Sequence, residues 1–173
     1  MTGGAAGQSG LDALDRYTGT KVSSGKFTPL SEANAGKPAL DPQEEYIFEL
    51  VERDAKESNG FLSDKDKQAG AVAPKVMKAF LTWKETKTGN LVFMTQRIDS
   101  LYWGNSDGTM KSGVISFLED IGIPVPAGKI PHWGSTFILT MKIRARVVPR
   151  IKNNQPVPNE YKFKEGSFRK YTA

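Results

Sequence analysis

The feature that most constrains this chain is the order of its periodic segments. Three segments with the two-residue alternation of β-strands come first, then one helical segment, then two further strand-like segments. This order is used by a small five-stranded barrel in which the single helix plugs one end. A β-sandwich with one stray helix is the main competing architecture. The pattern therefore predicts a mainly β fold in the form of this five-stranded barrel, with the helix between the third and fourth strands.

The alternation of apolar and polar side chains defines the five predicted strands. The first is apolar on both sides, with Phe48 and Leu50 on one face and Ile47 and Val51 on the other, which indicates a central or strongly curved position. Gly89 in the turn after the second strand favours a hairpin. The predicted ranges are Glu45 to Lys56, Val72 to Thr86, Leu91 to Ser100, Ser135 to Val148 and Asn159 to Lys164, with a last segment resuming at Phe168 to Tyr171.

The helix and the following strand have the clearest patterns. Between Ser112 and Ile121, apolar residues recur at the spacing of one helix face: Val114, Phe117, Leu118 and Ile121. In the fourth strand, core-type residues alternate with a face that becomes increasingly basic. A polar loop is predicted from Lys152 to Pro158.

Composition excludes several classes of site. The chain has no cysteine, so disulfides, thiolate nucleophiles and cysteine-based zinc sites are absent. No apolar run approaches the roughly 18 residues that a membrane span requires. The first ten residues lack the charged and apolar regions of a signal peptide. We expect a protein of the cytoplasm, without a cofactor.

Residues 1–40 are rich in Gly, Ala, Ser, Thr and Lys and poor in large apolar side chains. Such a segment buries too little surface to offset the entropy lost on ordering. We therefore predict a flexible tail over residues 1–40 and a folded domain over residues 41–173. Leu11, Leu14 and Tyr17 allow an alternative in which part of the tail docks as an amphipathic turn.

Positive charge is concentrated near the C-terminus. Residues 135–173 hold nine basic and two acidic side chains, a net charge of +7, whereas the whole chain carries +5. A nucleic-acid backbone is neutralised by such a surface, because counterion release drives binding. The alternative is a solvated outer face whose lysines and arginines guard a sheet edge.

A second signal is that aromatic residues are interleaved with basic ones in the second and third strands. Phe80 lies between Lys78 and Lys84 in the second strand, and Phe93 shares a face of the third with Arg97. If the two faces coincide, rings for bases and cations for phosphates are brought together. The alternative is that both rings are core while Trp83 and Met77 face outward. Two further rings, Tyr102 and Trp103, stand in a loop and could stack on bases or plug the barrel.

No catalytic pattern competes with this interpretation. His132 is the only histidine and has no nearby carboxylate or nucleophile in the sequence. The aspartates do not match a calcium loop, and no glycine-rich segment has the spacing of a phosphate-binding loop. We predict no enzyme activity. The rival hypothesis is a hydrolase with acids such as Asp99 and Asp107 gathered in a cleft.

The arrangement resembles that of single-stranded DNA-binding proteins of bacteriophages, which have the OB-fold. The resemblance covers residues 41–171 and rests on EEYIFELVE, SGVISFLEDIGIP, FILTMKIRARVVPRI and NNQPVPNEYKF. It implies sequence-independent binding of single strands in phage DNA replication or recombination. Many such proteins end in an acidic tail, whereas this chain ends in the basic and aromatic FRKYTA.

The resemblance and the charge pattern together predict a non-catalytic protein that coats single-stranded DNA or RNA. Partners would be the nucleic acid, replication or recombination proteins, and further copies in a homo-oligomer or cooperative assembly. The alternatives are a structural or assembly protein of a virus and a carbohydrate-binding OB module. The predicted binding residues are Lys78, Phe80, Lys84, Phe93, Arg97, Tyr102, Trp103, Lys142, Arg144 and Arg146.

Overall fold

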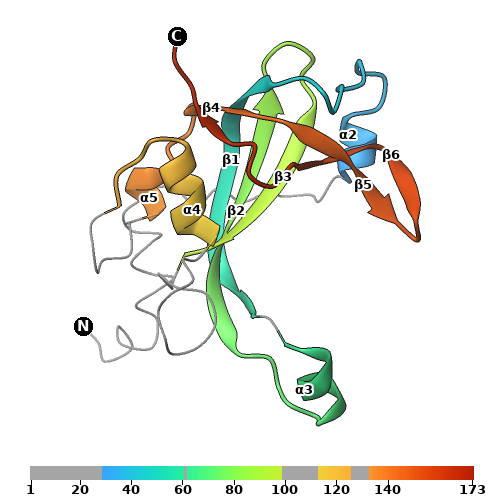
Figure 1. The fold of residues 1–173 in the computed structure, drawn as a ribbon, viewed down its shortest axis with the longest axis vertical. Coiled ribbons are helices and arrows are strands. Elements are labelled where there is room, and N and C mark those ends of the chain that lie inside the picture. The colour runs from blue at the N-terminus through green and yellow to red at the C-terminus, as the bar shows by residue number, and fades with distance from the viewer. Residues whose placement is uncertain (1–28, 61, 99–112, 126–132) are drawn as a thin grey trace.

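The computed structural model describes residues 29–60, 62–98, 113–125 and 133–173 of a mainly β protein (Figure 1). Its strands form an antiparallel five-stranded sheet, ordered β3-β2-β1-β4-β7, and a two-stranded sheet of β5 and β6. The elements are α2 (Leu30–Ala33), β1 (Tyr46–Asn59), α3 (Asp64–Gln68), β2 (Lys75–Glu85), β3 (Leu91–Arg97), α4 (Gly113–Asp120), α5 (Trp133–Thr136), β4 (Lys142–Ala145), β5 (Val147–Lys152), β6 (Gln155–Phe163) and β7 (Arg169–Lys170).

The predicted mainly β class is confirmed, but the strands described here do not close into one barrel. The larger sheet keeps β3 and β7 as its two edges. Figure 1 shows β1 and β2 extending together as a long hairpin that ends at α3, while β5 and β6 project from another side of the body. None of the helices described here is long and apolar enough to cross a membrane.

Strand β1 is central, as its apolar character on both sides predicts. It pairs with β2 over most of its length and with β4 through its first residues. The register with β2 shifts between Leu50 and Glu52, so Val51 is an extra residue in a β-bulge. The bulge reverses the alternation, because Leu50 before it and Arg53 after it are both buried.

The core lies on one side of the sheet, beneath α4. Trp83 of β2 is fully buried and its ring centroid is 6.4 Å from that of Phe117 in α4. The predicted apolar helix face is confirmed, since all four of its residues are buried. Phe163 of β6 contacts Phe48 edge-on, with centroids 4.9 Å apart, so the small sheet packs on the same core.

The fourth predicted strand is wrong in its first half. The expected strand began at Ser135, but residues 133–136 form α5 and the chain becomes extended only at Lys142. The guanidinium of buried Arg53 explains this, because it donates to the carbonyls of Gly134 and Phe137 and holds the segment in a turn. Burial lowers the pKa of Arg53, so these carbonyls also offset part of the cost of removing the cation from water.

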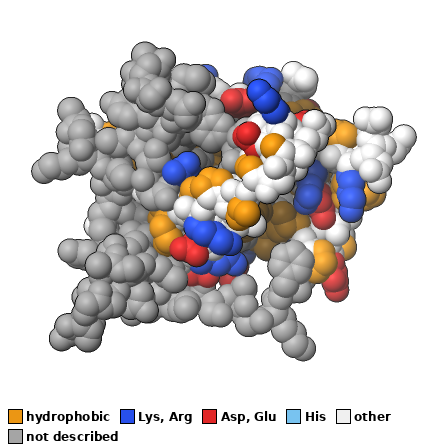
Figure 2. Space-filling model, turned by 90° about the horizontal axis from the view of Figure 1, so that it is seen from below, with side chains coloured by type: hydrophobic (Ala, Val, Ile, Leu, Met, Phe, Trp, Pro, Cys, Tyr) orange, Lys and Arg blue, Asp and Glu red, His pale blue; other side chains and the backbone are white. Residues whose placement is uncertain are grey.

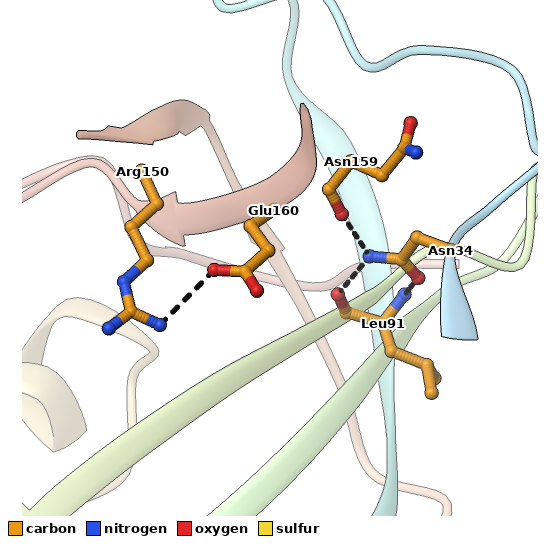
Figure 3. Close-up of polar contacts among 5 residues, drawn as sticks. All are labelled: Asn34, Leu91, Arg150, Asn159 and Glu160. Carbon is orange, nitrogen blue, oxygen red and sulfur yellow. Dashed lines mark hydrogen bonds and ion pairs between the residues drawn. The ribbon is translucent and has the colours of Figure 1, made fainter. Parts of the chain in front are cut away.

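The predicted loop from Lys152 to Pro158 is instead a β-hairpin. Asn153 and Asn154 have φ angles of 52° and 60°, the left-handed pair that a tight two-residue hairpin turn requires. The strand after the turn begins at Gln155 rather than Asn159. Arg150 and Glu160 form an ion pair of 3.2 Å across the hairpin (Figure 3).

Residues 29–40, which were assigned to the tail, pack on the folded domain. Asn34 is fully buried and its amide joins β3 to β6 (Figure 3). It accepts from the backbone N–H of Leu91 at 2.7 Å and donates to the carbonyls of Leu91 and Asn159, each at 2.9 Å. The sequence shows no apolar stripe here because the segment is attached mainly by hydrogen bonds, with Leu40 as its one side chain in the core.

Candidate nucleic-acid interface

The side of the sheet opposite α4 carries most of the predicted binding residues. In β2, Ala79, Leu81 and Trp83 point inward and are buried, so the intervening side chains point outward. Phe93 in β3 is 43% exposed. The alternative in which Trp83 faces outward is therefore wrong. The outward side chains Lys56, Lys78, Phe80, Phe93 and Arg97 are called the cation–aromatic cluster below.

Three cations of this cluster form one row across three strands. Lys78 is the register partner of Lys56 in β1 and of Arg97 in β3. Residues directly opposite in antiparallel strands point to the same side, and like charges in such pairs destabilise a sheet. A bound anion removes that repulsion. The row is thus an electrostatic arrangement that favours an anionic ligand.

Two aromatic rings lie beside the row. The ring centroids of Phe80 and Phe93 are 6.1 Å apart and their planes are tilted by 32°. The ammonium of Lys56 lies 4.6 Å from the centroid of Phe80, within the range of a cation–π contact. A solvent-facing pair of rings with cations at one end can stack on bases while the cations contact phosphates.

The outer face is not uniformly basic. Beyond the cluster, β1 contributes Glu49, Glu52 and Asp54 to the outward side, opposite Lys84, Thr82 and Phe80 respectively. Figure 2, which views the molecule from below rather than onto this face, likewise shows basic, acidic and apolar side chains mixed over the described part of the surface. The positive potential is therefore local to the row of cations and does not extend evenly over the sheet.

Lys84 lies at the turn between β2 and β3. The ends of the Lys84 and Lys37 side chains both lie close to Gly89. The Lys37 ammonium donates a hydrogen bond to the Gly89 carbonyl at 2.7 Å. Gly89 has a φ of 78°, which favours glycine. The buried carboxylate of Glu85 holds the turn by accepting from the backbone N–H groups of Lys87 and Thr88. Two cations thus converge on a turn with a fixed backbone.

The predicted cations of β4 form a separate group. Arg144 contacts Glu45 at 3.6 Å and donates to the Thr172 carbonyl at 3.3 Å, while the Lys142 ammonium lies 5.5 Å from the ring centroid of Tyr171. Arg144 therefore already has an acidic neighbour, and Lys142 an aromatic one.

The β4 group is also distant from the rings. On β1, Arg144 is opposite Ile47, whereas Phe80 is opposite Asp54. Ile47 and Asp54 are seven positions apart, which corresponds to roughly 20 Å along an extended strand. Arg146 follows the end of β4, where its backbone bonds with Ser167 and Lys164. The structure therefore brings Lys78, Phe80, Phe93 and Arg97 together and does not join Lys142, Arg144 and Arg146 to them.

Some site residues escaped prediction and others lie outside the described part. Lys56 was missed because the bulge at Val51 inverts the face on which it falls. Lys37 was missed because it stands in the predicted tail. Tyr102 and Trp103 lie outside the described residues, as do Asp99, Asp107 and His132 of the other hypotheses.

Within the described ranges, no three His, Asp or Glu side chains are grouped so as to hold a metal ion. A comparison with known protein families, curated proteins and solved structures finds no match for the chain.

Proposed function

We propose that this protein binds single-stranded DNA without sequence preference and without catalysis, in phage replication or recombination. The observation that carries the proposal is the row of Lys56, Lys78 and Arg97 beside two solvent-facing rings. The opposed cations Lys56 and Lys78, next to exposed aromatic side chains, are unfavourable for the stability of the protein without a ligand. They become favourable when phosphates and bases cover them.

The arrangement of elements supports an OB-like fold for this function. A long bulged first strand pairs with both the second and the fourth strand, and α4 lies between β3 and β4 in the chain. In such barrels, nucleic acid commonly lies across the second and third strands. The cation–aromatic cluster occupies these two strands and the adjoining half of β1.

One observation favours a second candidate, a structural or assembly protein of a virus. Glu49, Glu52 and Asp54 share the outer face with the cations. A surface with charges of both signs can be complementary to the surface of another protein. This candidate predicts self-association or binding to another protein, without salt-dependent affinity for oligonucleotides.

The test is a fluorescence-anisotropy titration with a labelled thymine oligonucleotide at two salt concentrations, with matched duplex DNA as competitor. Phe93→Ala should weaken single-strand binding by about 1–3 kcal/mol and leave the salt dependence unchanged, because a stacking contact carries no charge. Val72→Ala is the matched control, since Val72 is 89% exposed at the far end of the β1–β2 hairpin. Undetectable binding by the wild type at low salt would overturn the proposal.

A further inference from the structure

Strand β3 leaves one edge of the five-stranded sheet without a partner strand in the part of the chain described here. It has seven residues, contains no proline, and pairs with β2 without a register shift. Natural sheets protect such edges with prolines, bulges, lysines or a covering segment. In the described part of the chain, α2 and β6 lie against β3, and Asn34 bonds both backbone groups of Leu91, whereas no hydrogen-bonded strand accompanies the rest of β3 on this side.

The alternation of the ladder shows which backbone groups face this edge. The N–H of Ile98 donates to Met77 of β2 at 3.0 Å, so the even-numbered residues at this end of β3 bond toward β2. Leu91 bonds away from β2, toward Asn34. Backbone groups alternate in direction along a strand, so the N–H and C=O groups of Phe93 and Thr95 point to the open edge, as those of Leu91 do.

We propose that the β3 edge is the interface between two copies of this chain, which pair antiparallel with Thr95 on the twofold axis. The two Thr95 residues would exchange a pair of backbone hydrogen bonds. Each Phe93 would then lie opposite Arg97 of the other copy, with ring and guanidinium on the same side of the sheet.

The sequence of β3 selects this register over its neighbours. An axis at Arg97 would oppose two like charges, and an axis at Phe93 would require the backbone of Leu91, which Asn34 already occupies. The register centred on Thr95 avoids both conflicts and pairs Phe93 with Arg97. A second copy is therefore a better occupant of this edge than an unrelated strand, because the strand is complementary to itself.

The pairing would place the outer faces of both copies on the same side of one continuous sheet. The two cation–aromatic clusters would thus be neighbours across the axis. A ladder of so few residues buries little area, so we expect a weak dimer with micromolar rather than nanomolar affinity. The inference does not depend on nucleic-acid binding.

Disulfide cross-linking tests the geometry directly, because the chain has no native cysteine. Facing residues of a hydrogen-bonded pair have Cα atoms about 5.5 Å apart, which a disulfide can span. Full-length Thr95→Cys should form a disulfide-linked dimer under mild oxidation. Thr82→Cys, on the same face but in the adjacent strand β2, is the matched control and should remain largely monomeric.

Sedimentation velocity without nucleic acid provides the second measurement. The wild type should dimerise with rising concentration, and Thr95→Lys should weaken the dimer about tenfold because two cations then meet on the axis. Thr82→Lys adds the same charge away from the edge and should leave the dimer intact. The proposed interface is wrong if the wild type stays monomeric throughout the micromolar range, or if the two cysteine variants cross-link equally. Either result would leave the proposed function standing.

Discussion

Asn34 and Leu91 form a two-way hydrogen-bonded pair, in which one side-chain amide satisfies both backbone groups of an edge residue. The amide oxygen accepts at 2.7 Å and the amide nitrogen donates at 2.9 Å. Asn34 thereby takes the place of a neighbouring strand at this position. Because the same nitrogen also donates to Asn159 of β6, one buried side chain connects α2, β3 and β6.

Asn34→Ala should lower the free energy of unfolding by roughly 2–3 kcal/mol, since it leaves several buried backbone groups without partners. Urea denaturation followed by circular dichroism measures the loss. Glu32→Ala, at an exposed position of the same helix, is the control and should change stability little. Equal stability of the two variants would mean that α2 does not hold β3 and β6 together.

Glu85→Ala should destabilise the protein by roughly 2–3 kcal/mol, because the buried carboxylate accepts from two backbone N–H groups and from the Thr88 hydroxyl. Lys87→Ala is the control, since it changes an exposed side chain of the same turn and keeps its N–H. Thermal unfolding of both variants measures the difference. A small effect of the Glu85 change would show that water can replace the carboxylate.

Lys78→Ala and Arg144→Ala should separate the two groups of cations. Loss of one phosphate contact to a single strand lowers the slope of log affinity against log salt by about 0.7. We expect this change for Lys78→Ala and a smaller one for Arg144→Ala, because Arg144 already contacts Glu45. Anisotropy titrations over a salt series measure both slopes. The reverse order would move the binding site to β4.

Asn154→Ala should destabilise the β5–β6 hairpin by about 1–2 kcal/mol, because alanine tolerates the left-handed conformation poorly. Asn154 has a φ of 60°, and Asn154→Gly should retain or increase stability. Thermal melts of the two variants provide the comparison. If alanine and glycine behave alike, the turn does not hold the conformation described here.

The fold was predictable where periodicity is simple and side chains pack in one layer. The helix face of α4 and the alternation in β2, β3 and β4 could all be read from spacing, because burial imposes it directly. The turn at Asn153–Asn154 was missed because prolines on either side suggested a loop. The late start of β4 was missed because it depends on Arg53, which is 81 positions from Gly134 in the chain.

The candidate site was predictable in part for the same reason. Phe80, Phe93, Lys78 and Arg97 follow from alternation within two regular strands. The separation of Lys142 and Arg144 from them could not be predicted, because it depends on how β4 is placed along β1. The net charge of the sequence also does not show that Arg144 pairs with Glu45 and that Arg150 pairs with Glu160.

The β-bulge at Val51 determines which side chains of β1 reach the outer face. If β1 ran through Val51 as a regular strand without the bulge, every side chain beyond it would exchange sides, which would place Lys56 in the interior and Ala55 in water. Deletion of Val51 would instead remove the bulge and leave these side chains on their present sides. The bulge therefore lets β1 carry one more residue than the facing stretch of β2 and still present Glu52, Asp54 and Lys56 to solvent.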